Sequence, residues 1–204
     1  MGLFDKLFGG GKRKKRSKET VQTRGVHMPD LKIPVDEKFT IQFKKNGGKF
    51  IYCDSQEEVL EGLRNIIEEN QWDAMPFYSL NPSLQQRFEK ENLSFTHKAS
   101  ESEVFFTTCE HLVAQNGSIL VSSNQLLEKK LHEIPLNIIV FATTSQLVDT
   151  IGEGLKIIKK KYRERIPANI TTLKHFKPAS EESKDFLTYG SSSKHLYLLL
   201  LEDL

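Results

Sequence analysis

The chain has 204 residues, of which 38% are hydrophobic and 27% are charged, a composition typical of a soluble globular protein. This length suits one domain with a tail and is sufficient to bury a substantial core. The net charge is +2, but residues 1–18 contribute +6, which leaves −4 for residues 19–204. A mildly acidic body argues against a nucleic-acid-binding fold, which would carry a basic face.

Several protein classes are excluded by what the sequence lacks. No apolar run is long enough to span a membrane, and the start (MGLFDKLFGGG) lacks the continuous apolar core of a signal peptide. The two cysteines, Cys53 and Cys109, are too few and too far apart for a disulfide framework. We therefore expect the protein to reside in a reducing cytoplasm. There is no C-x-x-C motif, and we expect no iron–sulfur cluster or other cofactor to be held by this chain alone.

Residues 1–36 are expected to form a basic, disordered tail, followed by one domain over residues 37–204. The tail opens with two Leu-Phe pairs, continues through three glycines, and then reads KRKKRSK over residues 12–18. Such blocks repel themselves and stay disordered until they meet a polyanion. Two interpretations remain open: a flexible tail with no dedicated partner, or contact of residues 1–18 with an anionic membrane surface.

The first half of the domain alternates between strands and helices. Residues 39–43 (FTIQF) predict a strand or an extended lead-in, and an Asn-Gly-Gly turn then leads into a strand at residues 49–53. Ser55 and Glu58 form a capping box that begins a helix with one apolar face. A short helix is expected to begin near Pro82. Further strands are predicted at residues 75–80, 93–96 and 104–108.

The second half continues the same alternation. Strands are predicted at residues 119–121, 136–142, 170–176 and 195–201. A short helix is expected at residues 125–131, and a long helix capped by Thr144 or Ser145 is expected after the strand at 136–142. The buried stripe of the long helix is predicted to comprise Leu147, Val148, Ile151, Leu155, Ile158 and Tyr162. Gly152 and Gly154 indicate close packing along it.

Continuous apolar strands that alternate with helices indicate a largely parallel sheet covered on both faces. Ligands of such sheets bind beyond the carboxyl ends of the strands, and the segment 107–118 follows one such end. Its Asn-Gly-Ser turn could supply N–H groups for an anion, or could simply lead the chain into the next strand. The candidate ligand-binding residues are Thr107, Thr108, Glu110, Asn116, Gly117 and Ser118.

Four segments, in this order, resemble landmarks of the LUD domain of lactate-utilization proteins. They are residues 47–63 (GGKFIYCDSQEEVLEGL), 107–120 (TTCEHLVAQNGSIL), 134–151 (IPLNIIVFATTSQLVDTI) and 195–201 (HLYLLLL). The resemblance implies a Rossmann-like three-layer α/β sandwich of the sugar-isomerase and CoA-transferase-like type. The family includes the C component of a three-protein system associated with oxidation of lactate to pyruvate, and the resemblance implies that the redox cofactors lie in companion proteins.

The sequence departs from the LUD pattern near its end. Many members of that family carry a G-P-S-x-T-A-D-I stretch and a G-x-H-G-P turn, where this chain reads KPASEESKDF (177–186) and YGSSSKH (189–195). Ser180, Asp185 and Gly190 stand near the family's serine, aspartate and turn glycine. The Gly-Pro-Ser geometry and the turn histidine are missing, which predicts altered binding at these positions.

Glu110 is the candidate catalytic residue, because it lies just past a strand end beside two threonines. Relatives of this fold among the CoA-transferases use a glutamate nucleophile. A solvated acid or a charge near a helix N-terminus explains the same residue and is the more common case. Cys109 and His111 would supply only two ligands, so no metal site is predicted.

The leading hypothesis is a non-redox accessory component of lactate or related organic-acid oxidation. It would bind a ligand and assemble with iron–sulfur and oxidation components, without nucleic acid. The alternative is a small transferase or ligase that uses Glu110 on a CoA-, folate- or sugar-phosphate-type substrate. A third hypothesis is a structural protein whose main contact is the membrane or a partner. We expect a cytoplasmic protein, with the tail as the route to any contact with the inner membrane face.

Overall fold

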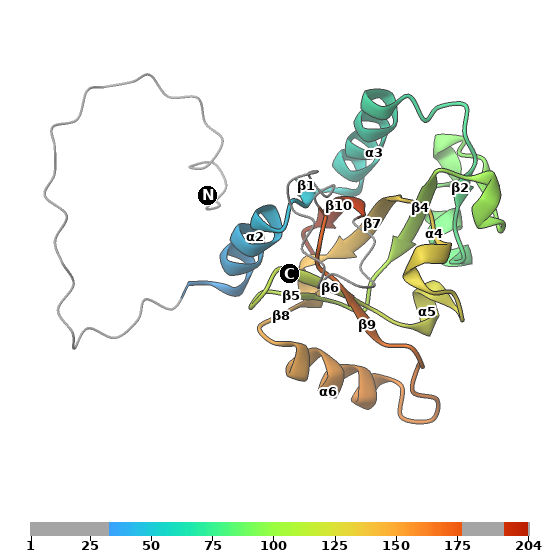
Figure 1. Ribbon diagram of the computed structural model, residues 1–204. Coiled ribbons are helices and arrows are strands. Elements are labelled where there is room, and N and C mark those ends of the chain that lie inside the picture. The colour runs from blue at the N-terminus through green and yellow to red at the C-terminus, as the bar shows by residue number, and fades with distance from the viewer. Residues whose placement is uncertain (1–32, 177–193, 204) are drawn as a thin grey trace, which may run out of the picture. The chain divides into compact units, whose positions relative to one another are not determined.

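The computed structural model describes residues 33–176 and 194–203, and within them six strands form a parallel sheet (Figure 1). In spatial order, the strands of this main sheet are β1 (Lys49–Cys53), β10 (His195–Leu201), β7 (Asn137–Thr143), β4 (Val104–Thr108), β2 (Phe77–Tyr78) and β3 (Phe95–Thr96). Every pairing in the sheet is parallel. The predicted α/β class and Rossmann-like sandwich are confirmed.

One face of the main sheet is covered by α3 (Gln56–Asn70) and α4 (Pro82–Arg87). Alternate residues of each strand point to this face, so that Phe106, Ile139 and Leu199 pack against the helices. Ser55 caps α3 as predicted, but the Glu58 carboxylate accepts from the Asp54 N–H, so the second bond of the predicted capping box is not formed. Helix α4 has a cap that was not predicted, at Asn81. The Ser55 hydroxyl accepts a hydrogen bond from the Glu58 N–H at 3.2 Å, and the Asn81 side chain accepts one from the Leu84 N–H.

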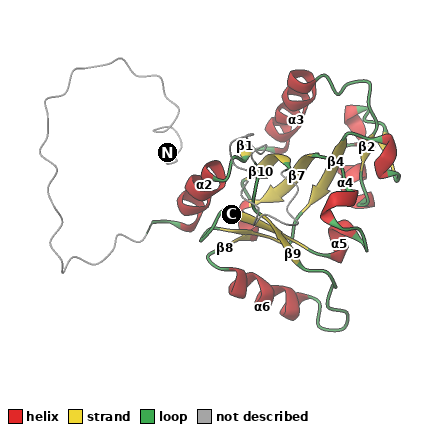
Figure 2. Cartoon of the chain, viewed as in Figure 1, coloured by secondary structure: helices red, strands yellow, loops and turns green. Residues whose placement is uncertain are grey.

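The other face is covered by a second, smaller sheet, which appears as a separate group of strands in Figure 2. Within the described residues it contains β8 (Leu147–Val148), β5 (His111–Val113), β6 (Ser118–Val121) and β9 (Thr171–Leu173). Helices α2 (Val35–Lys45) and α5 (Ser123–Leu126) contribute to the same core. Helix α6 (Ile151–Lys161) buries Ile158 against Val113, Leu120 and Val148 of this sheet.

Short 3-10 turns complete the described elements: η1 (Glu89–Glu91), η2 (Ala99–Glu101), η3 (Leu131–Glu133) and η4 (Thr144–Gln146). Among the described residues, no helix is long and apolar enough to cross a membrane. Residues 1–18, Ser180, Asp185 and Gly190 lie outside the described ranges, as does most of the predicted tail.

The prediction of an extended segment at residues 39–43 is wrong, because these residues belong to helix α2. Phe39 and Phe43 are buried one turn apart, while Ile41 between them is 48% exposed. A strand would have placed all three on one face, whereas a helix separates them. Acidic residues in the first turn and lysines in the last complement the helix dipole. These charges mark the two ends of the helix, but the hydrophobic alternation between them favoured a strand.

The long helix predicted to begin at Thr144 or Ser145 begins instead at Ile151, with Thr150 as its cap. Residues 144–146 form η4, and Leu147 pairs with Leu112 in the second sheet. Leu155 is 41% exposed and does not belong to the buried stripe. Of the two glycines, Gly154 packs closely against Leu120, while a Cβ at Gly152 would meet only the Thr150 hydroxyl, at an ordinary contact distance of 3.9 Å.

Two further predictions near the second sheet need correction. The helix expected at residues 125–131 is the shorter α5, which begins at Ser123 because the Ser122 side chain caps it. The chain then turns at Leu127, whose φ of +53° ends the helix. Strand β5 was not predicted, because its histidine and the polar residues around it resemble a turn.

Candidate functional site

The switch point of the main sheet lies between the carboxyl ends of β2 and β4. From β2 the chain passes through α4 to β3 at the sheet edge, whereas from β4 it passes through the second sheet to β7 on the other side. Ligands of open α/β sheets bind where neighbouring connections diverge in this way. Thr107 and Thr108, two of the predicted residues, end β4 at this point.

The two threonines differ in exposure. Thr107 is buried, and its hydroxyl donates to the Thr108 carbonyl oxygen at 3.3 Å. Thr108 is half-buried, and its hydroxyl oxygen lies 3.4 Å from the Asn81 side-chain amide, which comes from beyond β2. The switch point is therefore spanned by a contact between the last residue of β4 and a residue just beyond β2.

Glu110 lies in a buried hydrogen-bond cluster and is only 5% exposed. Among the described residues, four side chains donate to its carboxylate. Ser122 (2.7 Å), Asn124 (2.8 Å) and Gln125 (3.3 Å) contact Oε1, and Tyr162 (3.2 Å) contacts Oε2. This carboxylate links the start of β5 to α5 and to the end of α6. A nucleophile needs access to its substrate, so the arrangement favours a structural role.

The neighbours of Glu110 are also buried. The His111 Nδ1 lies 3.2 Å from the Gln146 carbonyl oxygen and must carry the proton, because a carbonyl only accepts. Burial lowers the pKa of His111 and raises that of the Cys109 thiol. Within the described residues, no group of three or more His, Cys, Asp or Glu side chains is placed to hold a metal ion.

The turn Asn116–Ser118 contacts helix α2 and its C-terminal cap. The Asn46 amide donates to the backbone oxygens of Asn116 (2.7 Å) and Gly117 (3.1 Å). Gly117 has φ of +64°, and a Cβ there would lie 2.4 Å from the backbone of Gln42 and Phe43. The glycine therefore permits a close approach of two backbones. Ligand binding by these residues stays a prediction.

Arg87, at the end of α4, is a candidate that the sequence analysis missed. Its guanidinium carbon lies 4.5 Å from the ring centre of Phe141, near the carboxyl end of β7. Its Nε donates at 2.8 Å to the side-chain oxygen of Gln56, the first residue of α3. The two terminal nitrogens make no hydrogen bond or ion pair with any described residue. One signal in the sequence could have identified it. Arg87 is the one arginine between Arg64 and Arg163, and it lies in a helix that follows a strand.

The two acidic residues that follow β10, Glu202 and Asp203, already have partners. Asp203, after β10, accepts hydrogen bonds from the Ser145 N–H (2.8 Å) and hydroxyl (2.7 Å) and from Thr144. Burial alone would raise the pKa of Asp203, but these hydrogen bonds outweigh it and hold the pKa below its usual value. Glu202 accepts from Tyr52, and burial together with this carboxylate raises the pKa of the Tyr52 phenol.

Comparison with known proteins decides the family. The sequence model of the LUD domain matches residues 37–200, which is most of the chain. The chain belongs to the LUD domain family. This family is linked to lactate utilization. No curated protein matches this LUD domain chain.

A solved structure shares the fold of this LUD domain. It is the crystal structure of a DUF162 family protein from Deinococcus radiodurans, with a TM-score of 0.54 and 14% sequence identity. The similarity covers 83% of this chain and 96% of the other. At this level of identity the likeness extends to the fold.

The carboxyl edge of the LUD domain thus presents chemically different groups. Glu110, Glu202 and Asp203 are carboxylates engaged by protein donors. Arg87 is a cation whose two terminal nitrogens contact no partner among the described residues. A guanidinium can donate two parallel hydrogen bonds to one carboxylate. The arrangement is suited to binding an organic anion at the edge where α/β sheets bind their ligands.

Proposed function

We propose that this LUD domain is a non-redox accessory component in the oxidation of lactate or a related organic acid. It binds the carboxylate of the acid at Arg87 and assembles with iron–sulfur and oxidation proteins that carry out the electron transfer. The observation that carries the proposal is the guanidinium of Arg87, which is exposed but held over the Phe141 ring and hydrogen-bonded to Gln56 at the carboxyl edge.

A fixed guanidinium binds a carboxylate with a smaller entropy loss than a free one. Arginine side chains carry about 2 kcal/mol of rotamer entropy, part of which the contacts with Phe141 and Gln56 have already removed. The two remaining nitrogens can then donate two parallel hydrogen bonds to one carboxylate. A hydroxy acid such as lactate presents this group together with a hydroxyl.

The separation of the two cysteines supports the assignment of redox chemistry to partners. Cys53 lies in the core on the α3 and α4 side of the main sheet, whereas Cys109 lies in the core on the opposite side. Both are buried, and the main sheet separates them. Iron–sulfur clusters are held by several thiolates that converge on one point. Companion proteins are therefore the proposed carriers of the clusters.

The alternative, a transferase or ligase that acts through Glu110, has less support. It requires a carboxylate that meets a substrate, and Glu110 is buried with its oxygens directed at protein donors. We place the accessory protein in the cytoplasm, with residues 1–18 contacting the anionic inner face of the membrane. The basic run at residues 12–18 supports that contact.

Isothermal titration calorimetry with L-lactate tests the binding proposal. We expect Arg87→Gln to weaken L-lactate binding at least tenfold, about 1.4 kcal/mol, without a change in fold. Lactamide, which lacks the carboxylate charge, should bind neither protein. The exposed Arg163→Gln is the matched control and should bind L-lactate like the wild type. Equal affinity of the wild type and Arg87→Gln would contradict the assignment.

A further inference from the structure

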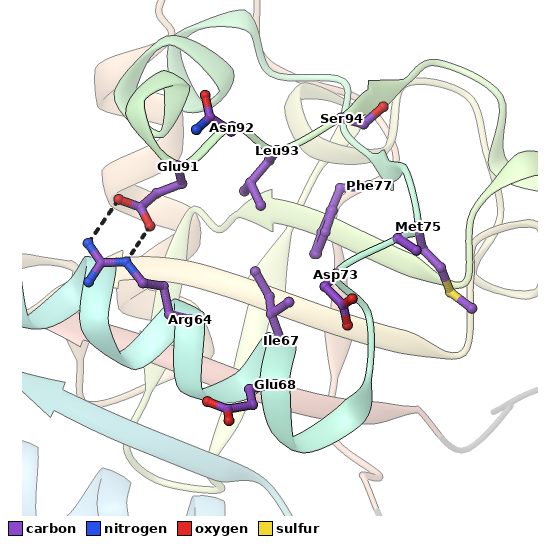
Figure 3. Close-up of a pocket in the computed structure, with 11 residues that line it drawn as sticks. Arg64, Ile67, Glu68, Asp73, Met75, Phe77, Glu91, Asn92, Leu93 and Ser94 are labelled. Atoms are coloured by element: carbon purple, nitrogen blue, oxygen red, sulfur yellow. Dashed lines mark hydrogen bonds and ion pairs between the residues drawn. The ribbon is translucent and has the colours of Figure 1, made fainter.

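A cavity of about 420 Å³ opens at the opposite, amino-terminal edge of the main sheet (Figure 3). Its walls come from the second half of α3, from residues 73–75 just before β2, and from residues 91–94 just before β3. The volume lies within the range of ordinary ligand pockets, roughly 300–1,000 Å³. The cavity shares none of its lining residues with the site at the carboxyl edge.

The inner wall of the cavity is apolar. Ile67, Met75 and Leu93 are partly buried side chains packed against the core on this side of the sheet, and Phe77 is buried among them. In Figure 3 the Ile67, Leu93 and Phe77 side chains lie between the Arg64–Glu91 pair on one side and Asp73 on the other. A partly exposed apolar wall gains free energy when an apolar group covers it, at about 25 cal/mol per Å² of surface removed from water. The cavity is therefore suited to an aliphatic or aromatic side chain.

The rim of the cavity is acidic. Arg64 donates two hydrogen bonds to Glu91, at 2.7 and 3.1 Å, so these two charges offset each other. Glu68 and Asp73 are exposed at the rim and form no ion pair with any described residue. The same helix also exposes Glu57, Glu58 and Glu61, whereas Glu69 is paired with Lys49 at 3.3 Å. The field around the opening is thus negative, which repels anions and attracts cations.

We propose that this cavity is a docking site for a segment of a partner protein in which an apolar anchor residue is flanked by lysines or arginines. The anchor side chain enters the apolar interior, and the flanking cations face Glu68 and Asp73. This combination follows from charge complementarity, because an acidic rim around an apolar interior disfavours acidic peptides, nucleic acids and anionic lipid. The proposal is independent of the carboxylate site at Arg87.

Fluorescence anisotropy with a labelled synthetic peptide, Lys-Arg-Leu-Phe-Lys-Arg, tests the proposal on the full chain. We expect saturable binding that weakens as salt rises, and at least tenfold weaker binding when Leu-Phe is replaced by Ala-Ala. The double variant Glu68→Lys/Asp73→Lys should reduce affinity at least tenfold. Ala74→Trp should do the same by filling the opening from an exposed position.

The matched control is Glu57→Lys/Glu61→Lys, which makes the same charge change on the first half of the same helix. It should reduce affinity no more than threefold. The proposal would be overturned by no binding below about 1 mM, by equal binding of the Ala-Ala peptide, or by equal losses in the control and rim variants. Displacement of the peptide by spermidine at equal concentration would instead identify a site for free cations, and would also overturn it.

Discussion

The guanidinium of Arg87 lies over the ring of Phe141, 4.5 Å from the ring centre, although α4 and β7 are about fifty residues apart in sequence. Phe141 is 6% exposed, so the ring is a fixed surface set by the core. The hydrogen bond to Gln56 fixes the guanidinium in a second direction. The proposed carboxylate site thus depends on three elements that only the folded sheet brings together.

A substitution of Gln56 should separate the effect of positioning Arg87 on ligand affinity from any effect on the stability of the fold. Its side-chain oxygen anchors Arg87, while its amide nitrogen is buried without a hydrogen-bond partner among the described residues. We expect Gln56→Met to leave stability unchanged or to raise it by about 1 kcal/mol, because an unsatisfied buried donor is removed. L-lactate affinity should fall three- to tenfold. Urea unfolding and calorimetry measure the two effects, with the exposed Gln86→Met as control. Unchanged affinity would show that Gln56 does not position Arg87.

Glu110→Gln should act on stability. The amide keeps the shape but loses the charge that four donors now share, and it places its own N–H groups among donors. We expect a loss of about 2–3 kcal/mol in the free energy of unfolding, typical of buried hydrogen bonds to a charged group. The control is Glu103→Gln, at an exposed carboxylate just before β4. It should change the free energy of unfolding by less than about 0.5 kcal/mol. Unchanged stability together with loss of a turnover reaction would favour the enzyme hypothesis.

Gly117→Ala should destabilise the domain strongly. The position requires φ of +64°, and the new Cβ would meet the α2 backbone at 2.4 Å. We expect a loss of about 2 kcal/mol or more in urea unfolding. Gly152→Ala is the matched control: the position is exposed in α6, and the new Cβ would make only an ordinary contact with the Thr150 hydroxyl at 3.9 Å, so the change should be neutral or stabilising by up to about 1 kcal/mol. Equal effects of the two substitutions would contradict the described contact between this turn and α2.

His111 should make stability depend on pH. Burial lowers its pKa below the usual 6.5, so the unfolded chain takes up a proton at a higher pH than the folded one. Its contribution is fully present above pH 6.5 and is lost as the pH falls from there toward the folded pKa. Unfolding free energies at pH 7.5 and 5.5 should differ less in His111→Gln than in the wild type. The exposed His195→Gln should behave like the wild type, and an identical pH effect in all three would contradict this role.

The sequence predicts the local elements well where helix caps and apolar runs agree, as at Ser55 with α3 and along β10. It fails where two periodicities coincide, because Phe39, Ile41 and Phe43 fit both a strand and part of a helix. It also fails where tertiary pairing overrides local pattern, as at Leu147, which pairs with Leu112 instead of extending a helix. Arg87 was missed for the same reason, since its partners Gln56 and Phe141 lie far away in sequence.

Native pull-down of the tagged full chain from its own host tests the central claim most directly. The partners would be identified by mass spectrometry, iron would be measured in the eluate, and lactate oxidation would be assayed in the eluate and in the isolated chain. The accessory role predicts recovery of an iron–sulfur protein and a second oxidation component, with oxidation only by the assembly. Recovery of the chain alone without iron, or turnover by the isolated chain, would contradict it.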